Sequence, residues 1–327
     1  MISDPAKFVS TVSLAKCNRL RPIAVVDAAI GRKELADEER IKKALQKTTG
    51  FPLEQEIANV LLSRNHVVFG NVLFEDGERV KEIDIEAILH VADSCFEQKW
   101  FVTPFLPIEC KMTRKYTWVF YRNVDTQRHV SCAQEMDPVC LKFDRQNHLL
   151  YLGLFRHYAE ERDRICSSHT VLDAPRGRPG GRDDVFDAVS KVGKFVTNRL
   201  QMLRDKYRPD RRDIFFFFPV IVFDGPMYQA EYRSGAMSVR AADAVILQTS
   251  IVSPLSGQVS PLYIDVVRRD RFPALLTSIE STADSANEML ANRKVRAILE
   301  RARRAADVLS SCRTIDLIAK YSVHVKR

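Results

Sequence analysis

The stretches VKEIDIEAIL (residues 80–89) and FLPIECK (residues 105–111) decide the fold of this chain. Side chains on a β-strand point alternately to its two faces. As a strand, the first stretch places three apolar and three acidic side chains on opposite faces. The apolar set is Ile83, Ile85 and Ala87, and the acidic set is Glu82, Asp84 and Glu86.

The second stretch alternates in the same way. Ile108 and Cys110 point to one face, and Glu109 and Lys111 point to the other. Two neighbouring strands of this kind bring Asp84, Glu109 and Lys111 together on one polar face. The sequence therefore predicts a metal site with a lysine beside it.

The composition is that of an ordinary globular protein. Of 327 residues, 46% are hydrophobic and 28% are charged, which argues against a disordered chain. The formal net charge of +8 is compatible with a polyanionic partner, although many proteins carry as much.

The seven cysteines are scattered and form no CxxC pair, so neither a disulfide framework nor a zinc ribbon is indicated. The segment between His129 and His169 is rich in Cys and His, but its spacings match no common zinc pattern. Reduced cysteines in a cytoplasmic protein are the simpler interpretation.

The chain shows no sign of a membrane or export segment. Residues 1–5 lack the charged and apolar regions of a signal peptide. The longest apolar run, residues 214–223, is about half a membrane span and predicts a buried strand. We expect a cytoplasmic protein without a membrane partner.

Apolar periodicity and turn residues predict the remaining elements. Helices are expected at residues 36–47, 53–64, 183–207 and 272–309. Strands are expected at residues 66–74, 80–89, 101–111, 117–121, 214–223, 227–232, 244–251 and 262–267. Residues 122–182 are expected to be irregular, apart from a possible element at 149–158. The order helix–β–β–β–helix–β indicates an α/β fold with a mixed central sheet.

Three segments resemble the PD-(D/E)xK nuclease superfamily: GFPLEQEIA (50–58), KEID (81–84) and IECK (108–111). Together with the element order, the resemblance covers about half the chain, mainly residues 50–111 and 183–223. It is similar to poorly characterised prokaryotic members in which Glu-Cys-Lys precedes Trp-Val-Phe, as at residues 118–120.

The resemblance implies a restriction-endonuclease-like core with a large insertion, C-terminal strands and a long helix. The domains expected on this basis are an N-terminal helical extension at 1–49, a nuclease-like domain at 50–270 with the insertion at about 113–182, and a C-terminal helix and tail at 271–327.

The chemistry of these residues suits metal-assisted phosphodiester hydrolysis. Mg²⁺ prefers oxygen ligands, which Asp84, Glu109 and the main-chain carbonyl of Cys110 would supply, and Mn²⁺ is expected to substitute. Lys111 would hold the attacking water and neutralise the phosphate. Glu54 would bind a second metal or orient a water, with Glu56 as the alternative.

Other basic residues are candidate nucleic-acid contacts. Arg176 and Arg178 lie in an Arg-Gly-Arg-Pro sequence like that of minor-groove peptides, although a flexible loop is the simpler interpretation. Lys191 and Lys194 lie on the helix that borders the active site in the superfamily. Surface lysines are the simpler interpretation for both.

The function expected from the resemblance is a Mg²⁺-dependent nuclease, acting on DNA, in prokaryotic defence or repair. RNA is the alternative substrate. The competing hypothesis is a catalytically inactive nucleic-acid-binding or scaffold protein that keeps the fold, as a subunit of a defence complex. A homodimer is plausible because cutting two strands often needs two active sites.

Overall fold

The computed structural model describes residues 38–42, 44, 50–77, 79–89, 100–122, 139–142, 162–173, 176, 178–179, 183–206, 212–252 and 259–291. The chain divides into two compact units, Met1–Lys47 and Thr48–Arg327. In the first unit, residues 38–42 and 44 are helical, as expected for part of the 36–47 helix. Everything described below belongs to the second unit.

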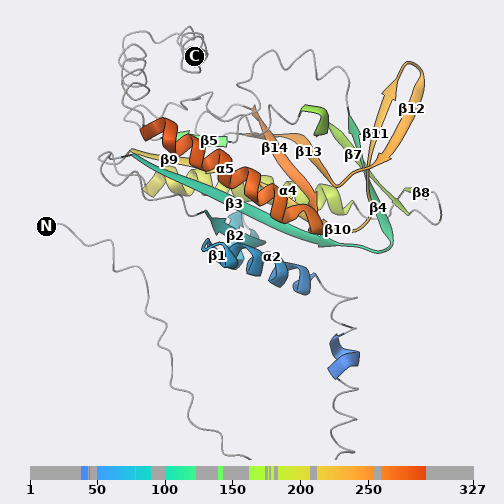
Figure 1. The fold of residues 1–327 in the computed structure, drawn as a ribbon, viewed down its shortest axis with the longest axis horizontal. Coiled ribbons are helices and arrows are strands. Elements are labelled where there is room, and N and C mark those ends of the chain that lie inside the picture. Colours follow the sequence, from blue (N-terminus) through green and yellow to red (C-terminus); the bar gives the residue numbers. More distant parts are fainter. Residues whose placement is uncertain are drawn as a thin grey trace, which may run out of the picture. The chain divides into compact units, whose positions relative to one another are not determined.

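The main sheet is mixed (Figure 1). Its central path runs in the order β1 (Val67–Asp76), β2 (Arg79–Ile88), β3 (Trp100–Met112), β10 (Val220–Asp224), β14 (Val259–Arg268), β13 (Ala244–Val252) and β6 (Ile165–Cys166). Strands β1, β2 and β3 are antiparallel neighbours, whereas β3, β10 and β14 run parallel. Strand β9 (Arg212–Phe217) also pairs with β3, and β5 (Val139–Lys142) pairs with β9.

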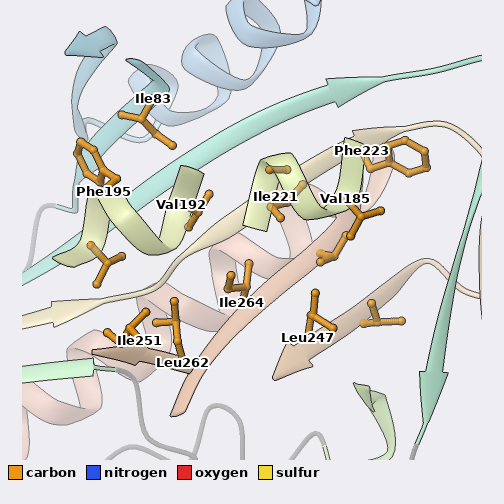
Figure 2. Close-up of a cluster of buried hydrophobic side chains, with 14 of the residues drawn as sticks. Ile83, Val185, Val192, Phe195, Ile221, Phe223, Leu247, Ile251, Leu262 and Ile264 are labelled. Carbon is orange, nitrogen blue, oxygen red and sulfur yellow. The ribbon is translucent and has the colours of Figure 1, made fainter. Parts of the chain in front are cut away.

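Helices cover both faces of this sheet. Helices α2 (Phe51–Ser63) and α5 (Phe272–Ala291) share one hydrophobic cluster with the sheet. This α2–α5 cluster includes Leu53, Ile108 and Leu276. Helix α4 (Asp184–Lys206) packs against β10, β13 and β14 in a second hydrophobic cluster, the α4 cluster. Figure 2 shows this α4 cluster, with Val192 among Ile221 and Ile264. The sequence accounts for helix α2, because Pro52 lies in its first turn and apolar residues recur at every fourth position.

A second sheet has the order β12 (Ala236–Ala241), β11 (Met227–Arg233), β4 (Tyr116–Arg122), β7 (Ser168–Asp173) and β8 (Arg178–Pro179). Strand β4 follows the end of β3 directly, and β11 follows the end of β10. The second sheet therefore extends from the edge of the main sheet where β3 and β10 end. Two short 3₁₀ turns, η4 (Arg162–Arg164) and η6 (Arg269–Arg271), complete the described elements.

The expected α/β class and mixed sheet are confirmed, and the order helix–β–β–β–helix–β is present as α2, β1, β2, β3, α4 and β9–β10. Three details were wrong. The strand expected at 214–223 is broken at Phe218 and Pro219, because proline cannot donate to the ladder. The supposedly irregular segment 122–182 contains β5, β6, β7 and β8, and the exposed strand β12 was not predicted. Residues 149–158 and the second half of the 272–309 helix lie outside the described residues.

The alternation expected for residues 80–89 fails at one point. Ile85 and Ala87 belong to the α2–α5 cluster as a pair, but Ile83 belongs to the α4 cluster. Asp84 also faces α4, where it meets a lysine of that helix. Two consecutive side chains therefore face α4, and the prediction that Ile83 shares a face with Ile85 was wrong.

The cause is a distortion in the pairing of β1 with β2. The ladder pairs Gly70 with Ile85 and Val72 with Ile83 in one register, and it leaves out the pair between them, Asn71 and Asp84; Asn71 has a φ of 52°. A positive φ is uncommon outside glycine and marks an irregular backbone. The same switch occurs on β1, where Val68 packs against the α2–α5 cluster and Val72 against the α4 cluster. The sheet is therefore locally irregular next to Asp84.

Within the described residues, no helix combines the length and the apolar character needed to cross a bilayer.

Candidate metal centre

Asp84 of β2 and Glu109 of β3 meet at one ammonium group. Lys191 Nζ of α4 lies 3.1 Å from Asp84 Oδ1 and 2.8 Å from Glu109 Oε1. Lys111 Nζ lies 2.7 Å from Glu109 Oε1 as well. The structure thus brings Asp84, Glu109 and Lys111 together on the α4 face, as the alternation of the two stretches predicted.

The backbone of β3 fixes Asp84. The amide of Cys110 donates to Asp84 Oδ2 at 2.7 Å. The side chain of Cys110 points the other way and is buried in the α2–α5 cluster, as expected. Burial raises the pKa of the Cys110 thiol well above its usual value, so the thiol stays protonated and inert.

Glu109 is the most enclosed member of the group, with a side chain that is 0% exposed. Burial raises its pKa, and the neighbouring Asp84 carboxylate raises it further, whereas Lys111 and Lys191 oppose the shift. Its buried Oε2 atom forms an ion pair with Lys191 Nζ at 2.7 Å. A buried carboxylate is costly unless it is paired with a cation in this way or coordinates a metal.

Lys191 is the lysine that links the two strands. Burial lowers its pKa, but the charges and hydrogen bonds of Glu109 and Asp84 outweigh that effect and raise the pKa overall. Lys191 is therefore a charged ammonium at neutral pH. Sequence reasoning placed it near the site but treated it as a surface lysine, which was wrong.

The structure distinguishes Glu54 from Glu56. Glu54 lies in the first turn of α2, and its pKa is raised by burial first and then by the charges of Asp84 and Glu109. Glu56 instead pairs with Arg269 of η6. Glu54 is therefore the helix carboxylate whose charge acts on the site.

The other predicted basic residues lie away from this centre. Lys194 pairs with Asp76 at 2.8 Å, which ties α4 to the end of β1. Arg176 is 71% exposed and lies 3.8 Å from Asp173. Arg178 is exposed and belongs to strand β8, so it is not in the free loop that the sequence suggested.

A second buried ion pair on the same face was not predicted as a pair. Glu86 of β2 is 3% exposed and meets Arg199 of α4. Burial raises the pKa of Glu86, and Arg199 counteracts it. Two basic side chains of α4, Lys191 and Arg199, thus each form an ion pair with a carboxylate of β2.

The described residues fit a cation held by two carboxylates rather than by a larger cluster. Within them, no three His, Cys, Asp or Glu side chains come together as a metal-binding group. Asp84 and Glu109 both contact Lys191 Nζ, so their carboxylates lie close enough together to face one cation. This donor set suits Mg²⁺, which commonly takes one or two carboxylates and completes its shell with water.

In the Cys- and His-rich segment between His129 and His169, the structure describes the side chains of Cys166 and His169. Cys166 is buried against Gln229, and burial raises the pKa of its thiol to about 11. His169 Nε2 lies 3.1 Å from Asp183 Oδ2. Both side chains have protein partners.

Comparison of the chain with protein-family models, with curated proteins and with solved structures found no match.

Proposed function

We propose that this protein is a Mg²⁺-dependent hydrolase of phosphodiester bonds in nucleic acid, with DNA as the expected substrate. The observation that carries the proposal is the meeting of Asp84 and Glu109 on one ammonium, with Lys111 beside them. Two carboxylates and a lysine on one face of neighbouring strands are what such a reaction needs.

Asp84, Glu109 and the carbonyl of Cys110 would hold the metal ion. When bound, a divalent cation lowers the pKa of a coordinated water and neutralises charge that develops on the phosphate. Mn²⁺ would serve in place of Mg²⁺, since it accepts the same oxygen ligands.

Lys111 would act on the attacking water and on the phosphate. Its side chain is 29% exposed, in contrast to the enclosed Glu109, so its ammonium reaches toward solvent. From there it can donate a hydrogen bond to a water or to a phosphate oxygen. Glu54 adds a negative charge near the two carboxylates and would orient a water or hold a second cation.

The element order and the mixed sheet support a restriction-endonuclease-like core, because three antiparallel strands and a parallel strand follow α2 in the expected sequence. On that basis we propose a cytoplasmic nuclease of defence or repair that works as a homodimer or in a larger complex.

One observation favours the competing function. Lys191 pairs with both Asp84 and Glu109, so the two carboxylates have a structural partner within the protein. A nucleic-acid-binding or scaffold protein that keeps the fold is therefore the second candidate.

Cleavage assays separate the two candidates. Plasmid, single-stranded DNA and RNA are incubated with the protein in Mg²⁺, Mn²⁺ or EDTA. We expect metal-dependent cutting that Asp84→Asn and Lys111→Ala abolish, and that Glu56→Gln preserves, because Glu56 pairs with Arg269. Cutting that survives Asp84→Asn and Lys111→Ala would contradict the assigned site. The absence of cutting on all three substrates would favour the scaffold function.

A further inference from the structure

A cavity of about 460 Å³ lies on the α5 side of the main sheet, where β12 leads into β13. Three arginines line it: Arg164 of η4, Arg240 of β12 and Arg271 of η6. Asp243 is the one acidic residue among the described residues that line it. The cavity therefore carries a surplus of positive charge.

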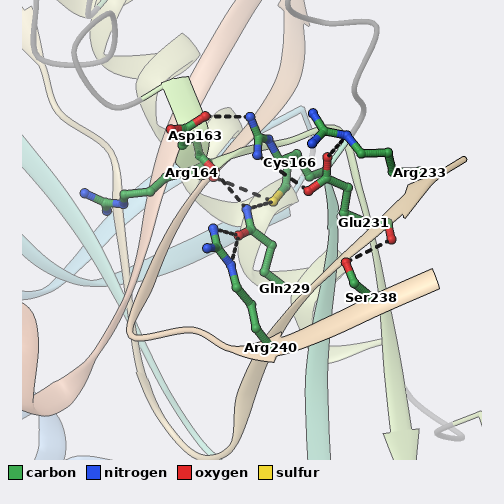
Figure 3. Close-up of polar contacts among 9 residues, drawn as sticks. Asp163, Arg164, Cys166, Gln229, Glu231, Arg233, Ser238 and Arg240 are labelled. Atoms are coloured by element: carbon green, nitrogen blue, oxygen red, sulfur yellow. Dashed lines mark hydrogen bonds and ion pairs between the residues drawn. The ribbon is translucent and has the colours of Figure 1, made fainter. Parts of the chain in front are cut away.

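Arg240 is held in place by a buried amide. Its Nε and Nη2 atoms donate to Gln229 Oε1 at 2.9 and 2.6 Å (Figure 3). Gln229 is 4% exposed, and its Nε2 donates to the carbonyl of Asp163 at 3.2 Å and to Cys166 Sγ at 3.5 Å. The amide thus fixes the guanidinium without neutralising it. Two of the five N–H donors of Arg240 are used in this way, which leaves three for a ligand.

The other cations are partly balanced. Arg271 Nη2 lies 3.0 Å from Asp243 Oδ2, and Arg164 Nη2 lies 3.7 Å from the buried Asp265. Arg240 is the guanidinium whose only bonded partner in the described chain is a neutral group. It is therefore the group best prepared to bind an anion.

The remaining wall is largely apolar. Ala244 and Val267 come from the sheet, and Ala274 and Leu275 come from α5. A ligand that combines an anionic end with a flat, weakly polar body would use both walls. Guanidinium groups bind phosphate through paired N–H donors, and small-molecule sites usually measure about 300–1,000 Å³.

We propose that this cavity binds a nucleoside phosphate, with the phosphate on Arg240 and the base against the apolar wall. The ligand is either a free nucleotide or one nucleotide of a nucleic-acid strand. The site does not depend on the proposed hydrolysis, since none of its residues belongs to the metal centre.

The cavity lies at the level of the metal centre in the sheet. Val267 of β14 is aligned with Val222 of β10, which is aligned with Cys110 of β3. Neighbouring strands are about 4.8 Å apart, so β14 lies roughly 10 Å from β3. The cavity lies on the α5 face and the metal centre on the α4 face, so a strand that reached both would have to pass round the edge of the sheet. A free nucleotide and a strand are therefore tested as separate ligands.

Binding is measured by isothermal titration calorimetry in EDTA, which prevents cleavage and removes metal-mediated binding. The probes are inorganic phosphate, adenosine 5′-monophosphate and a 5′-phosphorylated single-stranded hexanucleotide. Arg240→Gln is expected to weaken binding about tenfold or more, because it removes a charged donor. The matched control is Arg233→Gln, an exposed arginine of the same hairpin that does not line the cavity. Arg271→Gln is the second test variant, in case Arg240→Gln does not fold.

Tight binding of the mononucleotide would identify a free nucleotide as the ligand, and binding of the hexanucleotide alone would identify a strand. Either supports the proposal if Arg240→Gln or Arg271→Gln weakens it and Arg233→Gln does not. Equal binding in all arginine variants, or no binding of any probe, would overturn the proposal.

Discussion

Lys191 Nζ of α4 lies 2.8 Å from Glu109 Oε1 of β3 and also reaches Asp84 of β2. One ammonium therefore lies between two enclosed carboxylates and offsets part of their mutual repulsion. A cation bound by these carboxylates must compete with Lys191 or share the site with it.

Lys191→Met should destabilise the metal-free protein. Among the described residues, the substitution leaves Glu109 paired with Lys111 and removes the lysine paired with Asp84. Breaking a buried ion pair typically costs about 3–5 kcal/mol. Mg²⁺ should restore more stability to this variant than it adds to the wild type, because the ammonium no longer competes. Urea unfolding in EDTA and in Mg²⁺ measures both effects.

The control for this experiment is Lys194→Met, one turn farther along α4. Lys194 is 45% exposed and pairs with Asp76, so its loss should change stability little. Equal stability of Lys191→Met and Lys194→Met in EDTA would show that Lys191 does not support the two carboxylates.

Glu54→Gln should reduce cleavage, whereas Glu56→Gln should not. The charge of Glu54 acts on Asp84 and Glu109, and groups that support a metal site typically change activity by about 10–100-fold when altered. Glu56 forms an exposed pair with Arg269, worth about 1 kcal/mol or less. Initial cleavage rates of both variants decide the matter, and a larger loss in Glu56→Gln would reverse the assignment.

The alternation of residues 105–111 predicted the directions of Glu109 and Cys110 because a regular strand leaves only two faces. The contact of Lys191 with Asp84 joins residues 107 positions apart, which no local pattern specifies. One signal was available: Lys191 follows Ala188 by three residues and precedes Phe195 by four, and both of these are fully buried. A lysine at that spacing lies on the buried side of the helix.

Other features were beyond sequence reasoning for physical reasons. The turn of Ile83 toward α4 depends on the irregular backbone at Asn71, in a different strand. Strand β6 is two residues long, and its pairing with β13 stabilises it more than its own pattern does. Tertiary pairing commonly overrides local preference in such short strands.

Gly225→Ala should destabilise the junction between β10 and β11. A methyl group there would lie 2.5 Å from Phe223 Cζ and 2.8 Å from the carbonyl oxygen of Thr113. Phe223 is also stacked on Trp118 at 3.8 Å, so it has little room to move. Overpacking of this kind costs about 1–3 kcal/mol, which thermal unfolding detects.

Gly70→Ala is the matched glycine variant. Its added methyl group would lie 4.0 Å from the nearest atom, the carbonyl oxygen of Asp84, which is an ordinary contact. Its melting temperature should stay close to that of the wild type. A similar loss in both variants would mean that crowding at Gly225 is not the cause.

The stability of the metal-free protein should fall as pH rises through the raised pKa of Glu109. The folded protein holds this proton to a higher pH than the unfolded chain, whose pKa is near the ordinary 4.5. Between these two values the folded state binds more protons, so stability decreases with rising pH. Glu109→Gln should flatten this dependence in unfolding experiments in EDTA, and an unchanged slope would contradict the assigned burial.

Metal binding to Glu109 is the most direct test of the central claim, because it needs no knowledge of the substrate. Calorimetric titration of Mn²⁺ should show binding to the wild type and to Glu56→Gln, with a loss of about tenfold or more in Glu109→Gln. Undiminished binding in Glu109→Gln, or none in the wild type, would show that Asp84 and Glu109 do not form a metal centre.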